Sequence, residues 1–232
     1  MTTTLTPHQK TLRSTVARKA LMAVTGLVLI AFLLVHMYGN LKMFLGPESF
    51  DHYAEWLQVD ILYPLIPKGW FIWLFRAVLL LCVVLHMYSA ITLWLRAKKA
   101  TPDSYAVRSK LAQTHSSMAM RWGGVVLAGF LVFHILQFTA KMTLPSGYAG
   151  ESAYARVVAE FGLWWMVAFY ALWLLAIALH IRHGFWSAFS TLGANTSPKA
   201  ERVLNALAWC VALLLYLGFM VMPVSVFFGW IG

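Results

Sequence analysis

Five long apolar segments alternate along the chain with short polar stretches. The apolar segments are expected at 20–45, 70–95, 119–142, 161–188 and 204–230. Each is long enough to cross the hydrocarbon core of a bilayer, which takes about 20 apolar residues in a helix. The pattern therefore predicts an all-α integral membrane protein with five transmembrane helices, organised as a single domain over residues 1–232.

The four connections between these segments are expected to be loops. Residues 46–69 have Pro and Gly at both ends and are predicted to hold a short amphipathic turn of helix between them. Residues 96–110 are basic, and 143–156 are small and polar. Residues 193–202 open with a glycine that can stop a helix and contain Pro198, so a loop is predicted there as well.

Composition leaves very little room for a soluble domain. Of the 232 residues 61% are hydrophobic and 11% are charged, and the mean hydropathy is +0.71. Ordinary soluble domains carry roughly 25% charged residues. The two cysteines, Cys82 and Cys210, both lie in apolar runs, so they indicate neither a disulfide framework nor a Cys-x-x-Cys metal site.

The charged residues predict how the chain is oriented. Basic residues prevail before the first apolar segment, in the second connection and in the fourth: Lys10, Arg13, Arg18, Lys19, Arg96, Lys98, Lys99, Arg108, Lys110, Lys199 and Arg202. Acidic residues prevail in the first connection: Glu48, Asp51, Glu55 and Asp60. The positive-inside rule therefore predicts a cytoplasmic N-terminus and a C-terminus on the outer face. The excess of basic residues on the cytoplasmic side also explains the net charge of +10, so no nucleic-acid partner is needed to account for it.

Four of the eight histidines lie inside apolar segments, one in each of the first four. They are His36, His86, His134 and His180. A single histidine within the membrane is as often a packing residue as a ligand. Four on separate helices are harder to explain by packing, because each polar ring needs a partner to offset its transfer into lipid.

The depths of these histidines in the membrane group them into two pairs. At 1.5 Å per residue, His36 lies roughly 22 Å and His134 about 20 Å from the cytoplasmic edge. His86 lies roughly 12 Å and His180 about 8 Å from the same edge. The predicted pairs are therefore His36 with His134 at the outer level and His86 with His180 at the inner level.

Paired histidines in an apolar bundle point to two haem b groups, each bound through two axial histidines. A zinc site would require three or four ligands at one level, and no Cys, Asp or Glu accompanies either pair. A proton relay more often mixes carboxylates with histidines. Each ligating ring would also need an acceptor for its second N–H.

Residues near the predicted pairs suit such a cofactor. Arg121, Arg182 and His183 near the inner edge are candidate propionate contacts; a cationic side chain that reaches the interface is the alternative explanation for each. Small residues would let a ring or a helix approach closely. These are Gly26, Gly39, Gly123, Gly124, Gly129 and Gly184.

The chain resembles a known family along essentially its whole length. The segments that carry the resemblance are 19-KALMAVTGLVLIAFLLVHMYGNL-41, 85-LHMYSAITLW-94, 133-FHI-135 and 180-HIRHGFWSAFSTLG-193. They are similar to the five-helix, di-haem cytochrome b anchor of bacterial succinate dehydrogenases and fumarate reductases (respiratory complex II). In that family the ligands pair helix one with three and two with four, as the depths predict here. Ser190 departs from the glutamine that is frequent at its position in the family.

The resemblance implies a function in electron transport at the bacterial cytoplasmic (inner) membrane. The chain would anchor a flavoprotein subunit with FAD and an iron–sulfur subunit at the cytoplasmic face, and exchange electrons with a quinone, for which the family suggests menaquinone. Succinate oxidation, a step of the tricarboxylic acid cycle, would belong to the partner subunits. The chain itself has neither a dinucleotide fingerprint nor a cysteine cluster.

The quinone site has candidates at both faces. A quinone needs proton donors or acceptors beside its carbonyls. Asp51, His52 and Glu55 are the outer candidates, and Ser117 with Arg121 are inner ones; a solvated loop is the alternative explanation for the outer group.

Two other functional classes stay open from the sequence. One is the di-haem anchor of another quinone-reactive enzyme, such as a hydrogenase or formate dehydrogenase. The other is a haem-free transporter or anchor whose histidines serve packing. Paired histidine depths favour the cytochrome.

Overall fold

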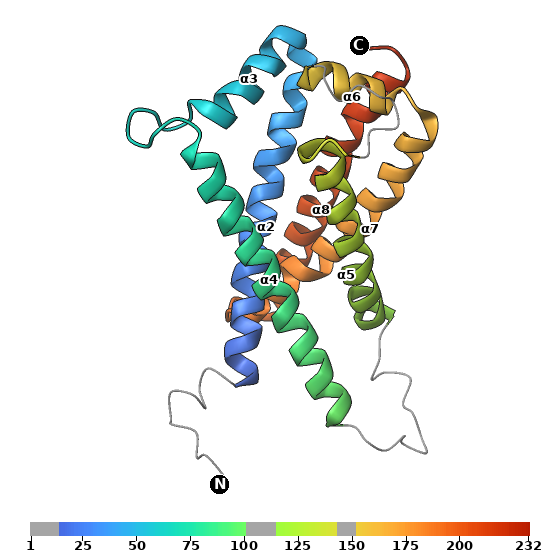
Figure 1. Ribbon diagram of the computed structural model, residues 1–232. Helices are drawn as coiled ribbons and strands as arrows, with labels where there is room; N and C mark the ends of the chain where they lie inside the picture. The colour runs from blue at the N-terminus through green and yellow to red at the C-terminus, as the bar shows by residue number, and fades with distance from the viewer. Residues whose placement is uncertain (1–13, 101–114, 143–151) are drawn as a thin grey trace.

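The computed structural model describes residues 14–100, 115–142 and 152–232, and side chains within the first turns of the second range are outside the description. The regular elements in these ranges are all helical (Figure 1). In chain order they are α2 (Thr15–Leu41), the 3₁₀ turn η1 (Lys42–Leu45), α3 (Pro47–Val59), α4 (Trp70–Lys99), α5 (His115–His134), the π-helical turn η2 (Ile135–Thr139), α6 (Ala153–Phe161), α7 (Trp164–Thr191) and α8 (Pro198–Phe227).

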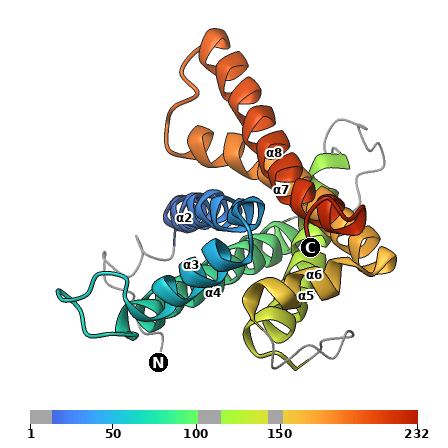
Figure 2. The same ribbon diagram turned by 90° about the horizontal axis from the view of Figure 1, so that it is seen from above.

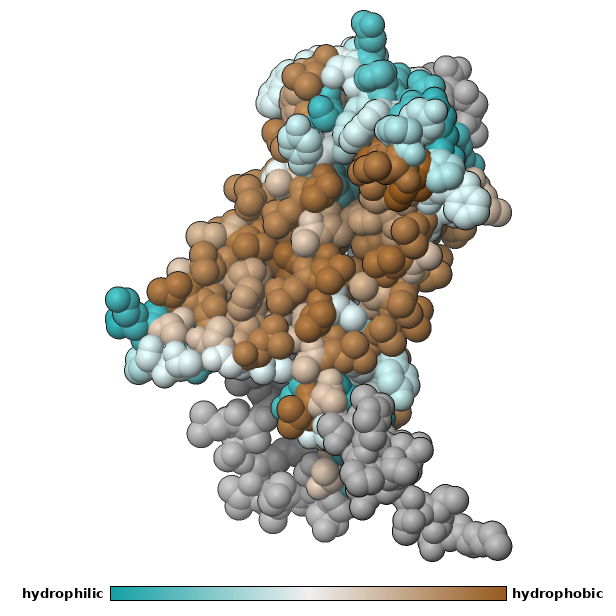
Figure 3. Space-filling view, turned by 90° about the vertical axis from the view of Figure 1, so that its left-hand side faces the viewer, coloured by the Kyte–Doolittle hydropathy of each residue, from teal (hydrophilic) through white to brown (hydrophobic). Residues whose placement is uncertain are grey.

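Five of the described helical segments are long and apolar enough to cross a membrane, which confirms the all-helical, five-helix part of the predicted fold class. They are Thr15–Leu45, Trp70–Lys99, Met120–Thr139, Trp164–Thr191 and Pro198–Phe227. Figure 3 shows a broad hydrophobic band around the middle of the molecule with hydrophilic residues at its ends. Helices are the expected solution there, because every backbone polar group must be satisfied within the segment in lipid.

Local sequence explains where several helices begin. Serine hydroxyls cap α2, α6 and α8: Ser14 accepts from Ala17 N–H at 3.0 Å, and Ser152 and Ser197 make the equivalent bonds. In α8 the proline lies at the first helical position, where its missing N–H does no harm. The prediction that Pro198 belongs to a loop was therefore wrong.

Two further helices differ from the sequence prediction. The first connection holds a helix of 13 residues, α3, rather than a single turn. Residues 153–161 form α6, where a loop was predicted up to 156 and a transmembrane helix from 161; Gly162 and Leu163 separate α6 from α7. Residues 101–114 and 143–151 of the predicted loops lie outside the described ranges.

The short helices gather at one end of the bundle. Helices α3 and α6 lie across the ends of the long helices, at the end that also holds the C-terminus (Figures 1 and 2). We call this the α3/α6 end, and the opposite one, where α2 begins, the Thr15 end. The main helix contacts are α7 with α8, α2 with α4, α2 with α7, and α5 with α7.

The buried core forms two clusters. The larger one lies at the α3/α6 end around Met43, Phe161, Met166 and Tyr170. The smaller one joins α2, α7 and α8 through Met37, Ile181 and Leu215. Helix α8 can approach α2 so closely because Gly218 faces the Met37 thioether, which a β-carbon at 218 would overlap.

Candidate paired-histidine site

The four histidines of the long helices form two ring pairs. The rings of His36 on α2 and His134 on α5 have centroids 5.9 Å apart. The rings of His86 on α4 and His180 on α7 have centroids 6.4 Å apart. The pairs are those predicted from the depths of the histidines along the sequence, and each pair joins two different helices.

This spacing suits two imidazoles on opposite sides of one metal ion. A metal–imidazole nitrogen bond is about 2.0–2.1 Å long, which places the centroids of two opposed rings roughly 6 Å apart. Packed aromatic rings cover the same range of distances. The distance between the rings therefore does not distinguish a metal ligand from a packing residue. The hydrogen bonds of the ring nitrogen that would not bind the metal are the observation that does.

In His86 that second nitrogen is held by backbone. Its Nδ1 lies 3.1 Å from the Met22 carbonyl oxygen and 3.3 Å from Thr25 Oγ1. A carbonyl can only accept, and the Thr25 hydroxyl donates to Leu21 O at 2.7 Å, so Nδ1 of His86 is the donor. The neutral ring then has a bare Nε2, which is the form that binds a metal.

The partner ring has an unsatisfied nitrogen. His180 Nδ1 is buried, and no residue in the described part of the chain makes a hydrogen bond to it. A buried imidazole nitrogen without a hydrogen bond is unfavourable, and in this respect His180 differs from His86, whose Nδ1 is held by the Met22 carbonyl. Small residues make room beside both rings: a β-carbon at Gly26 would lie 3.2 Å from His86 Cε1, and one at Gly124 would lie 3.8 Å from His180 Cε1.

In the outer pair, an aromatic shell surrounds the rings. Phe32 and Phe219 lie 5.4 and 5.7 Å from the His36 ring. Phe130 and Phe138 lie 5.8 and 5.5 Å from the His134 ring. These apolar faces exclude water and suit a flat apolar macrocycle.

Six buried polar atoms in the described residues, His180 Nδ1 included, have no hydrogen-bond partner. All six lie in the half of the bundle towards the Thr15 end. They are Arg18 Nε, Ser89 Oγ, His180 Nδ1, Arg182 Nε, Trp186 Nε1 and Ser190 Oγ. Apart from the His180 nitrogen, they are N–H or O–H groups that can donate to an anion. The sequence reasoning had missed Arg18, Ser89 and Trp186, because polar residues near a helix end are usually explained by the interface.

Within the described ranges, neither histidine pair is joined by a third ligand. Among the residues that the structure describes, no three His, Cys, Asp or Glu side chains gather closely enough to hold a metal ion. A pair of axial imidazoles matches haem iron, whose other four ligands come from the porphyrin, better than zinc.

Comparisons with models of protein families, with characterised proteins and with solved structures gave no match.

The candidate propionate contacts take different positions. Arg182 donates to Asn205 Oδ1 at 3.3 Å and lies over the Trp209 ring, so much of its guanidinium is directed to α8. The half-buried His183 ring lies 6.2 Å from Trp186. Arg121 is exposed near the start of α5, and the side chain of Ser117 is outside the description. Their roles towards a propionate or a quinone stay predictions.

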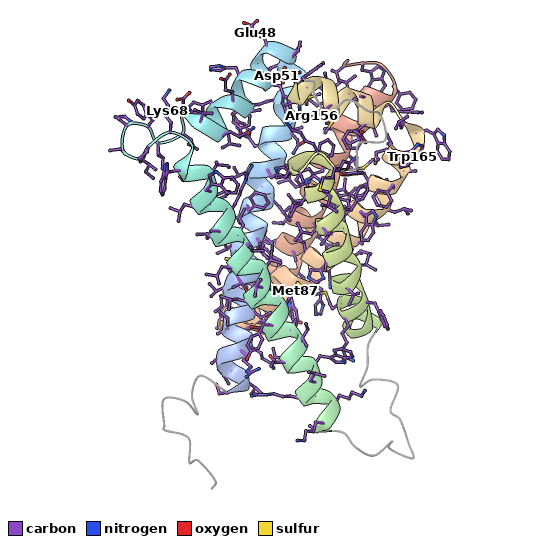
Figure 4. The ribbon with its side chains drawn as sticks, in the orientation of Figure 1. Glu48, Asp51, Lys68, Met87, Arg156 and Trp165 are labelled. Atoms are coloured by element: carbon purple, nitrogen blue, oxygen red, sulfur yellow. The ribbon has the colours of Figure 1, made fainter. Side chains whose placement is uncertain are left out.

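The outer quinone candidates lie on α3 and also differ from one another. His52 and Glu55 are exposed. Together with Leu45, Glu48 and Ser49, His52 lines a surface hollow of about 530 Å³. Asp51 instead accepts a hydrogen bond from the backbone N–H of Tyr154 at 2.8 Å, in the first turn of α6. Figure 4 shows Asp51 at this junction of the two short helices.

We expect the Asp51→Ala variant to be less stable, because it removes a charge-assisted hydrogen bond that ties α3 to α6. The loss should be about 1.5–3 kcal/mol, measured by thermal unfolding in detergent. Glu55→Ala, an exposed carboxylate on the same helix, is the matched control and should change little. Unchanged stability would contradict this structural role and leave the predicted quinone role of Asp51 as the explanation of its place on α3.

Sequence reasoning missed the buried polar residues beside His134. Tyr170 OH lies 3.1 Å from His134 Nδ1 and donates to Gln137 Oε1 at 2.6 Å. Gln137 Nε2 in turn donates to Glu160 Oε2 at 2.6 Å. Periodicity could not have found them, because Glu160 lies between the predicted loop (143–156) and the predicted fourth segment (161–188).

Proposed function

We propose that this chain is a di-haem cytochrome b membrane anchor that exchanges electrons with a membrane quinone. The observation that carries the proposal is the arrangement of four histidines from four helices as two ring pairs with centroids 5.9 and 6.4 Å apart. Packing alone would not require Nδ1 of His86 to be held by a backbone carbonyl, which leaves Nε2 of that ring bare.

The residues present fit two haems. His36 with His134 would hold one, and His86 with His180 the other. Bound there, the haems would supply one-electron transfer across the apolar interior. The chain's own side chains orient the ligand rings: the Met22 carbonyl accepts from His86 Nδ1–H, and the Tyr170 hydroxyl lies against His134 Nδ1.

The donors at the Thr15 end support the placement of anionic propionates there. Ser89 Oγ, Trp186 Nε1 and Ser190 Oγ are buried N–H or O–H groups without a protein acceptor among the described residues. In an apolar environment such groups are expected to be satisfied by a ligand or by water. They extend the set proposed from sequence, which comprised Arg121, Arg182 and His183.

Within this class we favour the anchor subunit of a succinate:quinone oxidoreductase. The support is the resemblance of the segments around His36 and His180 to that family. Flavoprotein and iron–sulfur subunits would then dock at the Thr15 end, for which the charge bias favours the cytoplasmic side. A bacterial inner membrane is the location that the family resemblance implies. Hydrogenase or formate dehydrogenase anchors are the alternative, with the same quinone chemistry.

For the quinone, which we take to be menaquinone on the family resemblance, the hollow beside His52 is the outer candidate. The His52 imidazole and the Glu48 carboxylate, which both line this hollow, are groups that can exchange protons with a quinone oxygen at the membrane surface. Ser117 and Arg121 at the other end remain the inner candidates.

The test is the haem b content per polypeptide in protein purified in detergent, by pyridine haemochrome and a dithionite-reduced spectrum. We expect a ratio near two from cells with ample haem. A ratio near zero under those conditions would contradict the proposal and favour a haem-free transporter or anchor.

A further inference from the structure

A chain of hydrogen-bonded side chains leads away from the outer histidine pair into the core of the α3/α6 end. It starts at His134 and continues through Tyr170 on α7 and Gln137 in the π-helical turn to Glu160 on α6, with distances of 3.1, 2.6 and 2.6 Å. Gln137 and Glu160 are fully buried, and Tyr170 is nearly so. We call these four residues the Glu160 chain.

Fully buried carboxylates and amides are rare unless they are paired, because their desolvation is unfavourable. Apolar rings surround this chain: the Tyr170 ring lies 5.2 Å from Phe130 and 4.9 Å from Phe161. The π-helical turn that carries Gln137 begins directly after His134, and such turns often occur at functional sites. The buried, paired polar groups and the π-helical turn next to His134 together indicate that the Glu160 chain supports the His134 ring.

The donors and acceptors of the Glu160 chain run in one direction. The amide nitrogen of Gln137 can only donate, so Glu160 Oε2 is the acceptor of that bond. The amide oxygen of Gln137 then accepts the Tyr170 hydroxyl hydrogen. With its only hydrogen donated, the Tyr170 oxygen can only accept from His134, whose Nδ1 must therefore carry the proton.

We propose that Glu160 is a positioning residue for the outer histidine pair. Through Gln137 and Tyr170 its carboxylate selects the His134 tautomer that is protonated at Nδ1 and bare at Nε2. The unprotonated Nε2 is the form that a metal ligand needs. The backbone carbonyl of Met22 does the same for His86 in the inner pair. The identity of the metal as haem iron rests on the proposed function, whereas the tautomer of His134 does not.

The first test removes the acceptor next to the ring. In Tyr170→Phe, we expect the affinity for the outer haem to fall by about 10–100-fold, as is typical when the hydrogen-bond partner of a metal-binding histidine is lost. The inner haem, with its own backbone acceptor, should be unchanged and serves as an internal control. Tyr154→Phe removes a hydroxyl from the same apolar cluster and should retain both haems.

The second test separates the acceptor from the rest of the glutamate side chain. Glu160→Gln retains an oxygen that can accept from Gln137, so the outer haem should bind nearly as tightly as in the parent. Glu160→Leu removes the acceptor and should weaken the outer haem as Tyr170→Phe does. Equal outer-haem affinity in the parent, Tyr170→Phe and Glu160→Leu would overturn the proposal, as would equal loss of both haems in Tyr170→Phe.

A third readout needs no haem. In full-length protein made without haem and labelled with ¹⁵N-histidine, His134 should give the signature of the Nδ1–H tautomer, assigned by its loss in His134→Ala. Tyr170→Phe should shift the ring to a mixture of tautomers. A chain that binds no haem but shows this tautomer would refute the proposed function alone. Two haems with His134 unaffected by Tyr170→Phe would refute the Glu160 chain alone.

Discussion

Replacement of His180 by alanine is expected to remove one of the two proposed haems b and to leave the other. The His180 ring faces His86 with a centroid distance of 6.4 Å, and its Nδ1 has no partner in the described part of the chain. Without one of two axial ligands the inner haem should be lost, since bis-histidine binding depends on both. The outer pair shares no ligand with the inner one and should stay loaded.

The measurement is haem per polypeptide, with the reduced α-band recorded to identify the haem that remains. His183→Ala is the comparison that distinguishes an iron ligand from a candidate propionate contact, because its imidazole lies on the same helix with its ring centroid 6.2 Å from that of Trp186. It should retain both haems. Two haems in His180→Ala, with one lost in His183→Ala, would show that His183 is the ligand.

A leucine in place of Gly26 is expected to expel the inner haem without altering a ligand. A β-carbon at that position would already lie 3.2 Å from His86 Cε1, which is tighter than ordinary contact. A larger side chain must displace the ring from Met22 O, which holds its tautomer. We expect the affinity for the inner haem to fall at least about tenfold, as for other lost supports of a metal-binding histidine.

Gly129→Leu is the control for this change. A β-carbon at Gly129 would meet nothing within 4 Å, and the residue is exposed on α5, so a leucine there should not displace a histidine ring. Haem titration of both variants, followed by absorbance, gives the comparison. Full haem content with an unaltered spectrum in Gly26→Leu would contradict the close approach of α2 to His86.

The fold and the ring pairs could be predicted because their signals are simple. A run of about 20 apolar residues has few alternatives to a transmembrane helix. The rise per residue in a helix is nearly constant, so the positions of His36 and His134 along their segments translate directly into a common level. Neither inference needs knowledge of side-chain packing.

The short helices and the Glu160 chain could not be predicted, for reasons that are also physical. Helix α6 has only nine residues, and the long apolar segment of α7 follows it closely. Its own hydrophobic periodicity is therefore weak evidence for a separate helix. Glu160 and Gln137 are 23 residues apart and meet only through tertiary packing. Asp51 resembled a solvated loop carboxylate because its partner is a backbone N–H of a distant helix.

Helix α4 is the least buried of the long helices, with 6% of its most apolar window buried against 33% for α8. Its main contacts are with α2 and α3, and His86 is its link to α7. A cofactor bound between these rings would therefore act as a cross-link that holds α4 in the bundle. Ligand binding stabilises the folded state by mass action. During biogenesis, a chain inserted without its cofactor should expose α4 to membrane proteases, so the cofactor supply would set the amount of protein that survives quality control.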